Sequence, residues 1–243
     1  MEKAEYSTSL KIGYQQVDYS GHWRLSDVFS QLADLATIHA EKINVWRPEM
    51  IEDYGWIVSK VRIRVLKPVR FEQRVEMKTW PGKGSRVIFP RYFTITDENG
   101  DCCMEAASLW TLLDLKNRRI VMPARSGITF PENLNLEVPL TIETDFSDED
   151  GLSVIETRQV RYSDIDTNQH LNNARYIEWT LDLLTRERFK EAYIADFSVY
   201  FKKETAPGET LTLEKKEDDH GFVVRGRNGE NVHFVAEGVW KKY

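Results

Sequence analysis

Two stretches of the chain carry apolar residues at the spacing of an amphipathic helix. The first stretch has its apolar stripe at Leu25, Val28, Phe29, Leu32 and Ala36. The second has an equivalent stripe at Tyr176, Ile177, Thr180, Leu181 and Leu184. We therefore predict one helix in each half of the chain.

Each predicted helix is followed by the period-two alternation of β-strands. One strand face in the first half carries Ile57, Val61, Ile63 and Val65, and one in the second half carries Leu211 and Leu213. Turn-forming pairs separate the strands: Pro81-Gly82, Asn99-Gly100, Pro207-Gly208 and Asn228-Gly229. Asn-Gly between alternating runs favours a hairpin. Each half thus reads as a strand, a helix and four further strands.

The chain also repeats a short motif ahead of each helix. Residues 14–22 read YQQVDYSGH, and residues 162–170 read YSDIDTNQH. The matching positions, each 148 residues apart, are Tyr14 and Tyr162, Val17 and Ile165, Asp18 and Asp166, and His22 and His170. The motif and the element order together predict two copies of one fold.

Strands joined by hairpins are antiparallel, and a helix with one apolar stripe must pack on the apolar face of such a sheet. We predict an α+β protein of two tandem hotdog domains, each a long helix wrapped by an antiparallel β-sheet. The N-terminal hotdog is assigned to residues 1–120, a linker to 121–150 and the C-terminal hotdog to 151–243. Pro123, Pro131, Pro139 and the acidic run 145–150 indicate a largely solvated linker.

Composition restricts the function classes. The net charge of −6 and the pI of about 5.5 argue against a nucleic-acid-binding protein. The two cysteines, Cys102 and Cys103, are adjacent, which fits a reducing compartment. No apolar run approaches the roughly 20 residues of a membrane span, and the first residues resemble neither a signal nor a transit peptide. We expect a cytoplasmic protein that contacts no membrane.

Candidate chemistry gathers ahead of the second predicted helix, where Asp166, Asn168 and His170 alternate. In an extended segment their side chains would share one face. Asn172 or Asn173 can cap the helix, whose first N–H groups could stabilise an oxyanion. This set suits acyl transfer. The alternative is that Asp166 and Asn168 only form a turn and a cap.

Glu204 is the candidate general base for this set. It follows an apolar strand predicted to run beside the second helix, and partial burial would suit a carboxylate to that role. The alternative is a solvated strand end beside Lys202 and Lys203. The first copy keeps Asp18 and His22, but Ser20 and Pro68 stand at the positions of Asn168 and Glu204. We therefore predict that the second half is catalytic and the first is chemically inert.

The remaining histidines show no metal-ligand spacing with Cys or Glu. His39 falls in the first predicted helix, His220 in a turn and His233 on a strand. We expect no metal site and no cofactor.

The second-half segment SDIDTNQHLNNARYIEW (163–179) closely resembles the signature of the acyl-acyl carrier protein (acyl-ACP) thioesterases of plant plastids and bacteria. The first-half segments 58–81 and 107–119 are similar to the same family. The resemblance implies hydrolysis of fatty acyl-ACP, with Asp166, Asn168, His170 and Glu204 as the catalytic residues. Many plant members have Cys directly after the glutamate, whereas this chain has Thr205. That departure favours attack by water.

The resemblance also implies that the first hotdog holds the acyl chain. Val28, Phe29, Leu32 and Trp56 are the candidates for lining that site, with plain core packing as the alternative. The implied partner is acyl carrier protein, an acidic protein. Its basic docking candidates are Arg161, Lys202 and Lys203 near the predicted site, and Arg118 and Arg119 farther away. A homodimer of the tandem chain is a further possibility.

Three rival functions stay open at this stage. An acyl-CoA thioesterase would perform the same chemistry on another carrier. A hotdog dehydratase would use a histidine and a carboxylate without needing Asn168. A non-catalytic acyl sensor would only bind.

Overall fold

The computed structural model describes residues 4–130, 136–142 and 150–243. The first half contains β1 (Tyr6–Lys11), α1 (Leu25–Lys42), β2 (Tyr54–Val65), β3 (Arg74–Pro81), β4 (Phe89–Asp97), β5 (Cys102–Asp114) and β6 (Arg119–Val121). The second contains β7 (Ser153–Gln159), α2 (Asn173–Asp182), β8 (Ala192–Phe201), β9 (Thr210–Glu217), β10 (Gly221–Asn228) and β11 (Asn231–Lys242). The predicted order of strand, helix and four strands is confirmed in both halves, and β6 is an addition.

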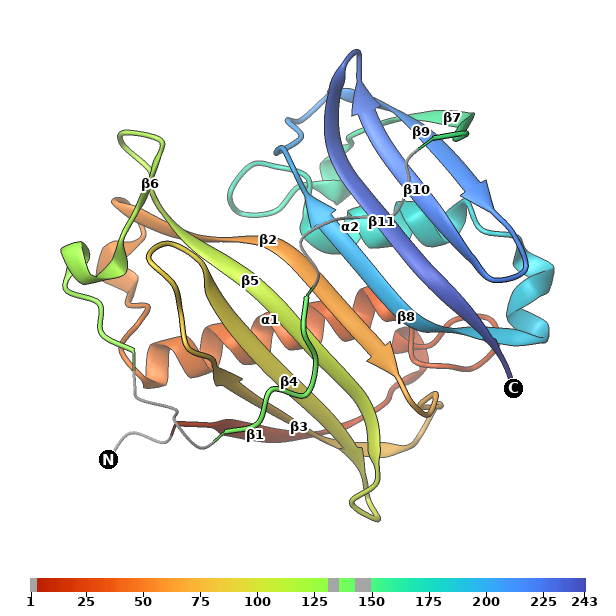
Figure 1. The fold of residues 1–243 in the computed structure, drawn as a ribbon, viewed down its shortest axis with the longest axis horizontal. Coiled ribbons are helices and arrows are strands. Elements are labelled where there is room, and N and C mark those ends of the chain that lie inside the picture. The colour runs from red at the N-terminus through yellow and green to blue at the C-terminus, as the bar shows by residue number, and fades with distance from the viewer. Residues whose placement is uncertain (1–3, 131–135, 143–149) are drawn as a thin grey trace.

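The strands form one sheet that runs through both halves (Figure 1), in the order β1-β3-β4-β5-β2-β8-β11-β10-β9-β7, with β6 on β5. The halves meet where β2 pairs antiparallel with β8, from Lys60 opposite Tyr200 to Arg64 opposite Asp196. Arg62 strengthens this junction with a two-pronged ion pair to Asp196, at 2.8 and 2.9 Å. Backbone and charged contacts therefore join the two copies into one continuous layer.

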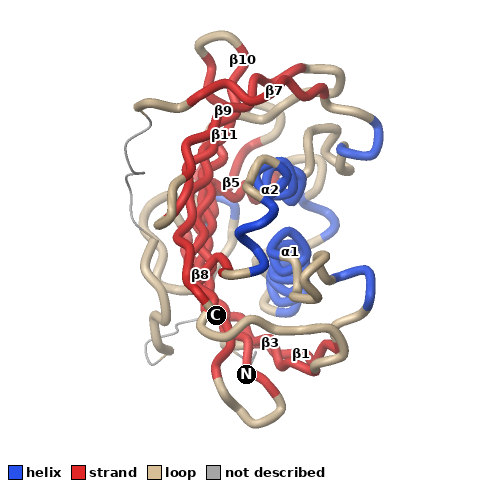
Figure 2. The backbone as a smooth tube through the Cα atoms, turned by 90° about the vertical axis from the view of Figure 1, so that its right-hand side faces the viewer, coloured by secondary structure: helices blue, strands red, loops and turns tan. Residues whose placement is uncertain are grey.

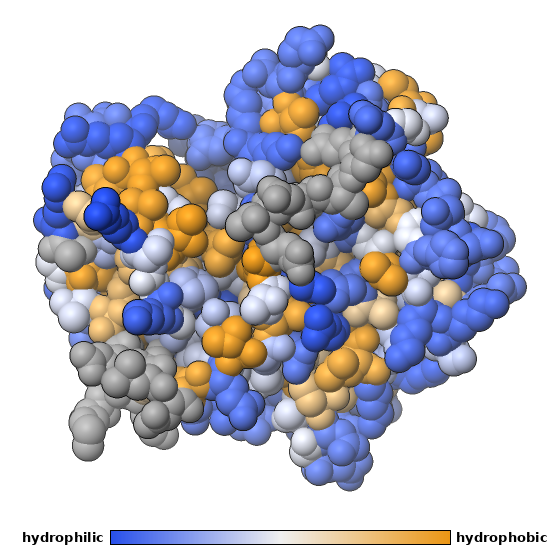
Figure 3. Space-filling view, viewed as in Figure 1, coloured by the Kyte–Doolittle hydropathy of each residue, from blue (hydrophilic) through white to orange (hydrophobic). Residues whose placement is uncertain are grey.

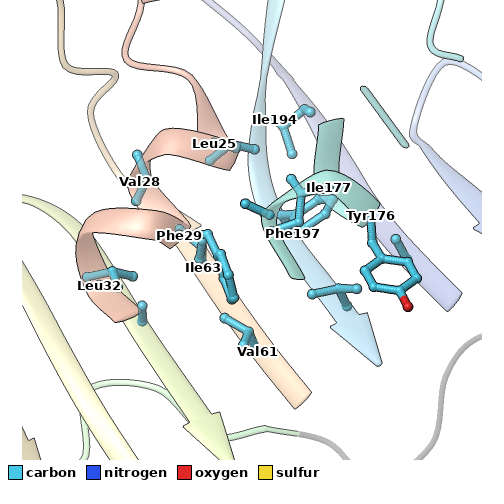
Figure 4. Packing of buried hydrophobic residues seen from close by; sticks show 14 of the residues in the cluster. Leu25, Val28, Phe29, Leu32, Val61, Ile63, Tyr176, Ile177, Ile194 and Phe197 are labelled. Atoms are coloured by element: carbon cyan, nitrogen blue, oxygen red, sulfur yellow. The ribbon is translucent and has the colours of Figure 1, made fainter. Parts of the chain in front are cut away.

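Both helices lie on the same face of this sheet, side by side (Figure 2). Their apolar stripes meet the inward residues of the central strands (Figure 4). Val28, Phe29 and Leu32 of α1 are buried in a cluster that also includes Ile63 of β2 and Phe197 of β8. The α+β tandem hotdog is confirmed, as two layers around one apolar core.

Two details of the predicted elements are wrong. The second helix ends at Asp182, so Leu184 lies beyond it, although its side chain is still buried. Ile57 does not share a face with Val61, because the register of β2 against β5 shifts between Val58 and Lys60. Such a bulge exchanges inward and outward positions along the strand, so that Val58 is buried instead.

The predicted turns fall where strands end. Gly100 lies between β4 and β5 and Gly229 between β10 and β11, both with positive φ, at 85° and 57°. Only a residue without a Cβ adopts that conformation at little cost. Pro81 ends β3, and Gly208 lies between β8 and β9.

The described part of the linker is not fully solvated. Residues 136–142 cross the sheet face that is turned away from the helices (Figure 1). Leu140 is buried there, and the carbonyls of Glu137 and Thr141 accept hydrogen bonds from Trp80 and Arg62, at 3.0 and 2.9 Å. Leu140 and these two hydrogen bonds therefore anchor a segment that its prolines marked as a boundary. Pro131 and positions 145–149 of the acidic run lie outside the described residues.

Apolar side chains also reach the surface of this outer face over the first half, among hydrophilic neighbours (Figure 3). Neither helix in the described ranges has the length and apolar character needed to cross a bilayer.

Candidate active site

Asp166, Asn168 and His170 form a tight turn, and the extended segment expected from their alternation is wrong. The Asp166 carboxylate accepts the backbone N–H groups of Asn168 (2.8 Å) and His170 (3.4 Å). The backbone N–H of Asp166 donates to the carbonyl of His170 at 2.9 Å, and Gln169 takes a positive φ of 63° to close the loop. Asp166 therefore holds the backbone of the other two residues in place.

The turn leads directly into α2. Asn172 is the N-cap: its side chain accepts the N–H of Ala174 at 2.9 Å, and its carbonyl accepts that of Arg175 at 2.9 Å. This settles the choice between Asn172 and Asn173 as the cap. Asn172 thus accepts the N–H groups of Ala174 and Arg175. The N–H of Asn173, the first residue of α2, does not bond to this cap and lies beside the turn that carries His170.

Glu204 lies against His170, as the resemblance implies. Its Oε2 is 3.4 Å from His170 Nε2. It sits in the loop after β8, which ends at Phe201, and its side chain is 40 % exposed, so the condition of partial burial is only weakly met. The same oxygen accepts a hydrogen bond from Arg118 Nη2 at 3.0 Å. The expectation that Arg118 lies far from the site is wrong.

Arg118 reaches the second half because it sits at the tip of the β5–β6 hairpin. Asp114 fixes that tip by accepting the backbone N–H and the side-chain amide of Asn117, both at 2.8 Å. Arg118 itself has a positive φ of 47°. The sequence offered only the pair Arg118-Arg119 as a signal, and it could not show that a hairpin of one half touches the glutamate of the other.

A buried hydrogen-bond chain supports the loop that carries Glu204. The next residue, Thr205, is fully buried, and its hydroxyl accepts from Tyr176 at 2.9 Å and lies 2.8 Å from His233 Nδ1. Burial raises the pKa of Tyr176 to about 12 and lowers that of His233. The carbonyl of Thr205 accepts the N–H of Leu171, which ties this loop to the turn at 2.9 Å. The threonine hydroxyl is thus a structural anchor, and buried His233 has a structural role beside it.

The first half builds the same turn with different chemistry. Asp18 Oδ1 accepts the backbone N–H groups of Ser20 (2.8 Å) and His22 (3.2 Å), as Asp166 does in its copy. Ser20 Oγ lies 2.6 Å from the same oxygen and 2.8 Å from His22 Nδ1. The His22 ring is therefore linked to Asp18 through Ser20. Burial, followed by the charge of Arg70, lowers the pKa of His22.

Backbone hydrogen bonds fix which residue corresponds to Glu204. The N–H of Leu171 donates to Thr205, and in the first half the N–H of Trp23 donates to Val69 at 2.8 Å. Pro68, the residue before Val69, therefore stands where the second half has its glutamate. The first half, as far as the structure describes it, therefore has Asp18 in its turn but no counterpart of the Glu204 carboxylate beside it.

The four residues suggested as acyl-chain contacts fall into two clusters. Val28, Phe29 and Leu32 belong to the central core beneath α1 (Figure 4). Trp56 is partly buried in a separate cluster, where its ring meets those of Phe89 and Phe130 edge-on, with centroids 5.7 Å apart in both cases. The structure thus keeps Trp56 apart from the other three.

The match to family models decides the relationship. Residues 3–124 match the model of the acyl-ACP thioesterase N-terminal domain, and residues 148–242 match that of the C-terminal domain. The chain belongs to the acyl-ACP thioesterase family. The residues between the two matches, 125–147, lie within the connection between β6 and β7.

Several curated relatives of this acyl-ACP thioesterase family member come from plants. The palmitoyl-ACP thioesterase of Cuphea hookeriana is 27 % identical over 165 residues, or 65 % of this chain and 40 % of the relative. An oleoyl-ACP thioesterase of Arabidopsis thaliana is 23 % identical over 195 residues, or 72 % of this chain and 53 % of the relative. The chain thus spans about half the length of these curated relatives, or less.

Solved structures share the fold over the full chain. An acyl-ACP thioesterase from Bacteroides thetaiotaomicron has a TM-score of 0.84 at 23 % identity, covering 98 % of both chains. The 12:0-ACP thioesterase of Umbellularia californica has a TM-score of 0.87 at 18 % identity, covering 100 % of this chain and 99 % of its own. At such identities the likeness establishes the tandem hotdog architecture.

Proposed function

We propose that the protein hydrolyses the thioester of fatty acyl-ACP to a free fatty acid and the thiol of the carrier. One observation supports this above all: in a member of the thioesterase family, Glu204 lies 3.4 Å from His170 beside the turn built by Asp166. A carboxylate or an imidazole within reach of a water molecule can act as the general base of a hydrolysis.

In the proposed mechanism, Glu204 with His170 polarises a water molecule and takes up its proton. The water oxygen attacks the thioester carbonyl carbon, and the C–S bond then breaks as the sulfur regains a proton. The N–H of Asn173 and the amide of Asn168 are the candidate donors to the transient oxyanion. Asp166 orients the turn, because its carboxylate accepts the backbone N–H groups of Asn168 and His170 and, at 3.4 Å, the side-chain amide of Asn168.

The division of labour between the halves is part of this proposal. The first half would hold the acyl chain against Val28, Phe29, Leu32 and Trp56, and each buried methylene would contribute roughly 0.8 kcal/mol. The acidic carrier would dock at the mouth of the second-half site, where Lys202, Lys203 and Arg161 are exposed. The cytoplasmic location and a homodimer of the tandem chain stay predictions.

The proposal is tested by hydrolysis of matched acyl-ACP and acyl-CoA substrates across a range of chain lengths. We expect turnover of acyl-ACP, with the chain-length preference read from the same panel. Turnover of acyl-CoA alone would retain the chemistry but reject the carrier. Acyl binding without hydrolysis of either substrate would favour the sensor.

The contact between Arg118 and Glu204 predicts that Arg118→Gln lowers kcat by about threefold to tenfold. The lost charge-assisted hydrogen bond would free the carboxylate to turn away, while partial exposure limits the energy involved. Steady-state kinetics on one acyl-ACP measures this effect. The matched control is Arg119→Gln on the same hairpin, which should change only KM, more at low salt, by weakening carrier docking. If Arg118→Gln, like Arg119→Gln, changed KM and left kcat unaltered, Arg118 would be a residue for docking the carrier.

A further inference from the structure

A cavity lies at the first-half turn, away from Glu204. It has a volume of about 310 Å³ and opens between the start of α1 and the end of α2. Its walls are largely apolar and include Trp23, Leu25, Met104, Leu184 and Ile194. A cavity of this size with a few converging polar groups has the character of a small-molecule site.

The polar wall of the cavity is the inert counterpart of the catalytic turn. Asp18, Ser20 and His22 line it, and the Tyr243 hydroxyl lies 3.1 Å from His22 Nδ1. A carboxylate only accepts hydrogen bonds, so the Ser20 hydroxyl donates to Asp18 and accepts from His22. Ser20 and Tyr243 thus engage His22 only through Nδ1, and His22 Nε2 is buried without a hydrogen-bond partner in the described part of the chain. Pro68, in the same wall, has no proton-accepting side chain. The cavity can therefore bind a ligand but, in the walls that the structure describes, lacks a counterpart of the Glu204 carboxylate beside its histidine.

Two arginines line the cavity without a carboxylate partner among the described residues. Arg24 donates to the carbonyl of Val17 at 2.9 Å, and the Arg186 guanidinium lies over the Tyr19 ring at 5.0 Å. Asp182, which also lines the cavity, is already paired with Arg158 at 2.8 Å. Asp18 is the remaining acid, and three donors within the turn engage it. The cavity thus combines an apolar interior with cations available to an anion.

We propose that this cavity is a non-hydrolytic binding site for a free fatty acid of medium chain length, with its carboxylate at Arg24 and Arg186. An engineered cavity of about 150 Å³ holds benzene, so roughly twice that volume suits a ligand of about twelve non-hydrogen atoms, such as decanoate. The choice of a fatty acid over another amphiphilic carboxylate rests on the proposed function, because a fatty acid is its product.

Methyl NMR of ¹³C-methyl-labelled methionine tests the site without any turnover. Met104 and Met77 both belong to the central core, but only Met104 of the two lines the cavity, and Met50 belongs to the separate Trp56 cluster. On titration with decanoate, the Met104 methyl signal, assigned with Met104→Leu, should shift saturably. Shifts confined to Met50 or Met77, or none at millimolar decanoate, would overturn the proposal.

Variants separate carboxylate recognition from mere apolar uptake. Arg186→Gln, at an exposed position, should weaken decanoate binding about fivefold, and the double variant with Arg24→Gln should weaken it further. Arg161→Gln, beside the other turn, is the matched control and should leave the titration unchanged. Leu181→Trp should fill the cavity and abolish the Met104 shift.

Decan-1-ol, which lacks the negative charge, should bind the wild type more weakly than decanoate does. Its affinity should not change with the arginine substitutions. Equal affinity for decanol and decanoate, or arginine variants that bind like the wild type, would refute the site. If the wild-type protein showed the Met104 shift but hydrolysed no acyl-ACP of the substrate panel, only the proposed function would be rejected.

Discussion

Glu204→Gln is expected to lose about two to four orders of magnitude in turnover, the range typical of a lost general base. Glutamine preserves the size of the side chain and can still accept a hydrogen bond from Arg118, but it cannot take a proton from water. The measurement is kcat on the best acyl-ACP of the panel. His170→Ala, assayed in parallel, should also abolish most of the activity.

A matched control for this substitution is Glu230→Gln, which changes the same group at an exposed position beside the β10–β11 turn. It should retain wild-type turnover. If Glu204→Gln hydrolysed acyl-ACP at a near-normal rate, the glutamate could not be the base, and His170 would become the candidate.

Phe197→Ala should destabilise the protein by about 3–5 kcal/mol, as large-to-small changes at fully buried aromatic positions do. Phe197 lies on β8 opposite Ile63 of β2, so its ring fills the core at the junction of the two halves (Figure 4). Such a loss is large against a typical net stability of about 5–15 kcal/mol. Urea unfolding followed by circular dichroism measures it.

The control for this prediction is Phe71→Ala, because Phe71 is 44 % exposed in the loop between β2 and β3. It should cost less than about 1 kcal/mol. A Phe197 variant as stable as that control would show that the junction between β2 and β8 contributes little to the fold.

The sequence by itself determined the order of elements and the presence of two copies. Helical and period-two spacing of apolar residues show which side chains are buried, and such spacing can be recognised within a short stretch of the sequence. Asn99-Gly100 and Asn228-Gly229 were equally readable, since positive φ restricts the residue type at a turn. Local spacing failed at Ile57, where a bulge that depends on the partner strand exchanged the two faces.

The chemistry of the site was readable in its residue types but not in its geometry. Asp166, Asn168 and His170 stand within five positions, so any compact fold would keep them together. The prediction of an extended segment was wrong, because the Asp166 side chain accepts nearby backbone N–H groups and thereby closes a turn. Glu204 was placed against His170 only with the help of the family signature.

Contacts between distant segments were decided by the tertiary structure alone. The pairing of β2 with β8 carries the hairpin of the first half to the glutamate of the second, which brings Arg118 to Glu204 across 86 positions of sequence. The same junction sets the start of α1 beside the end of α2 and leaves the cavity with Arg24 and Arg186 between them. No local pattern encodes such contacts, because they depend on how the two copies pack against each other.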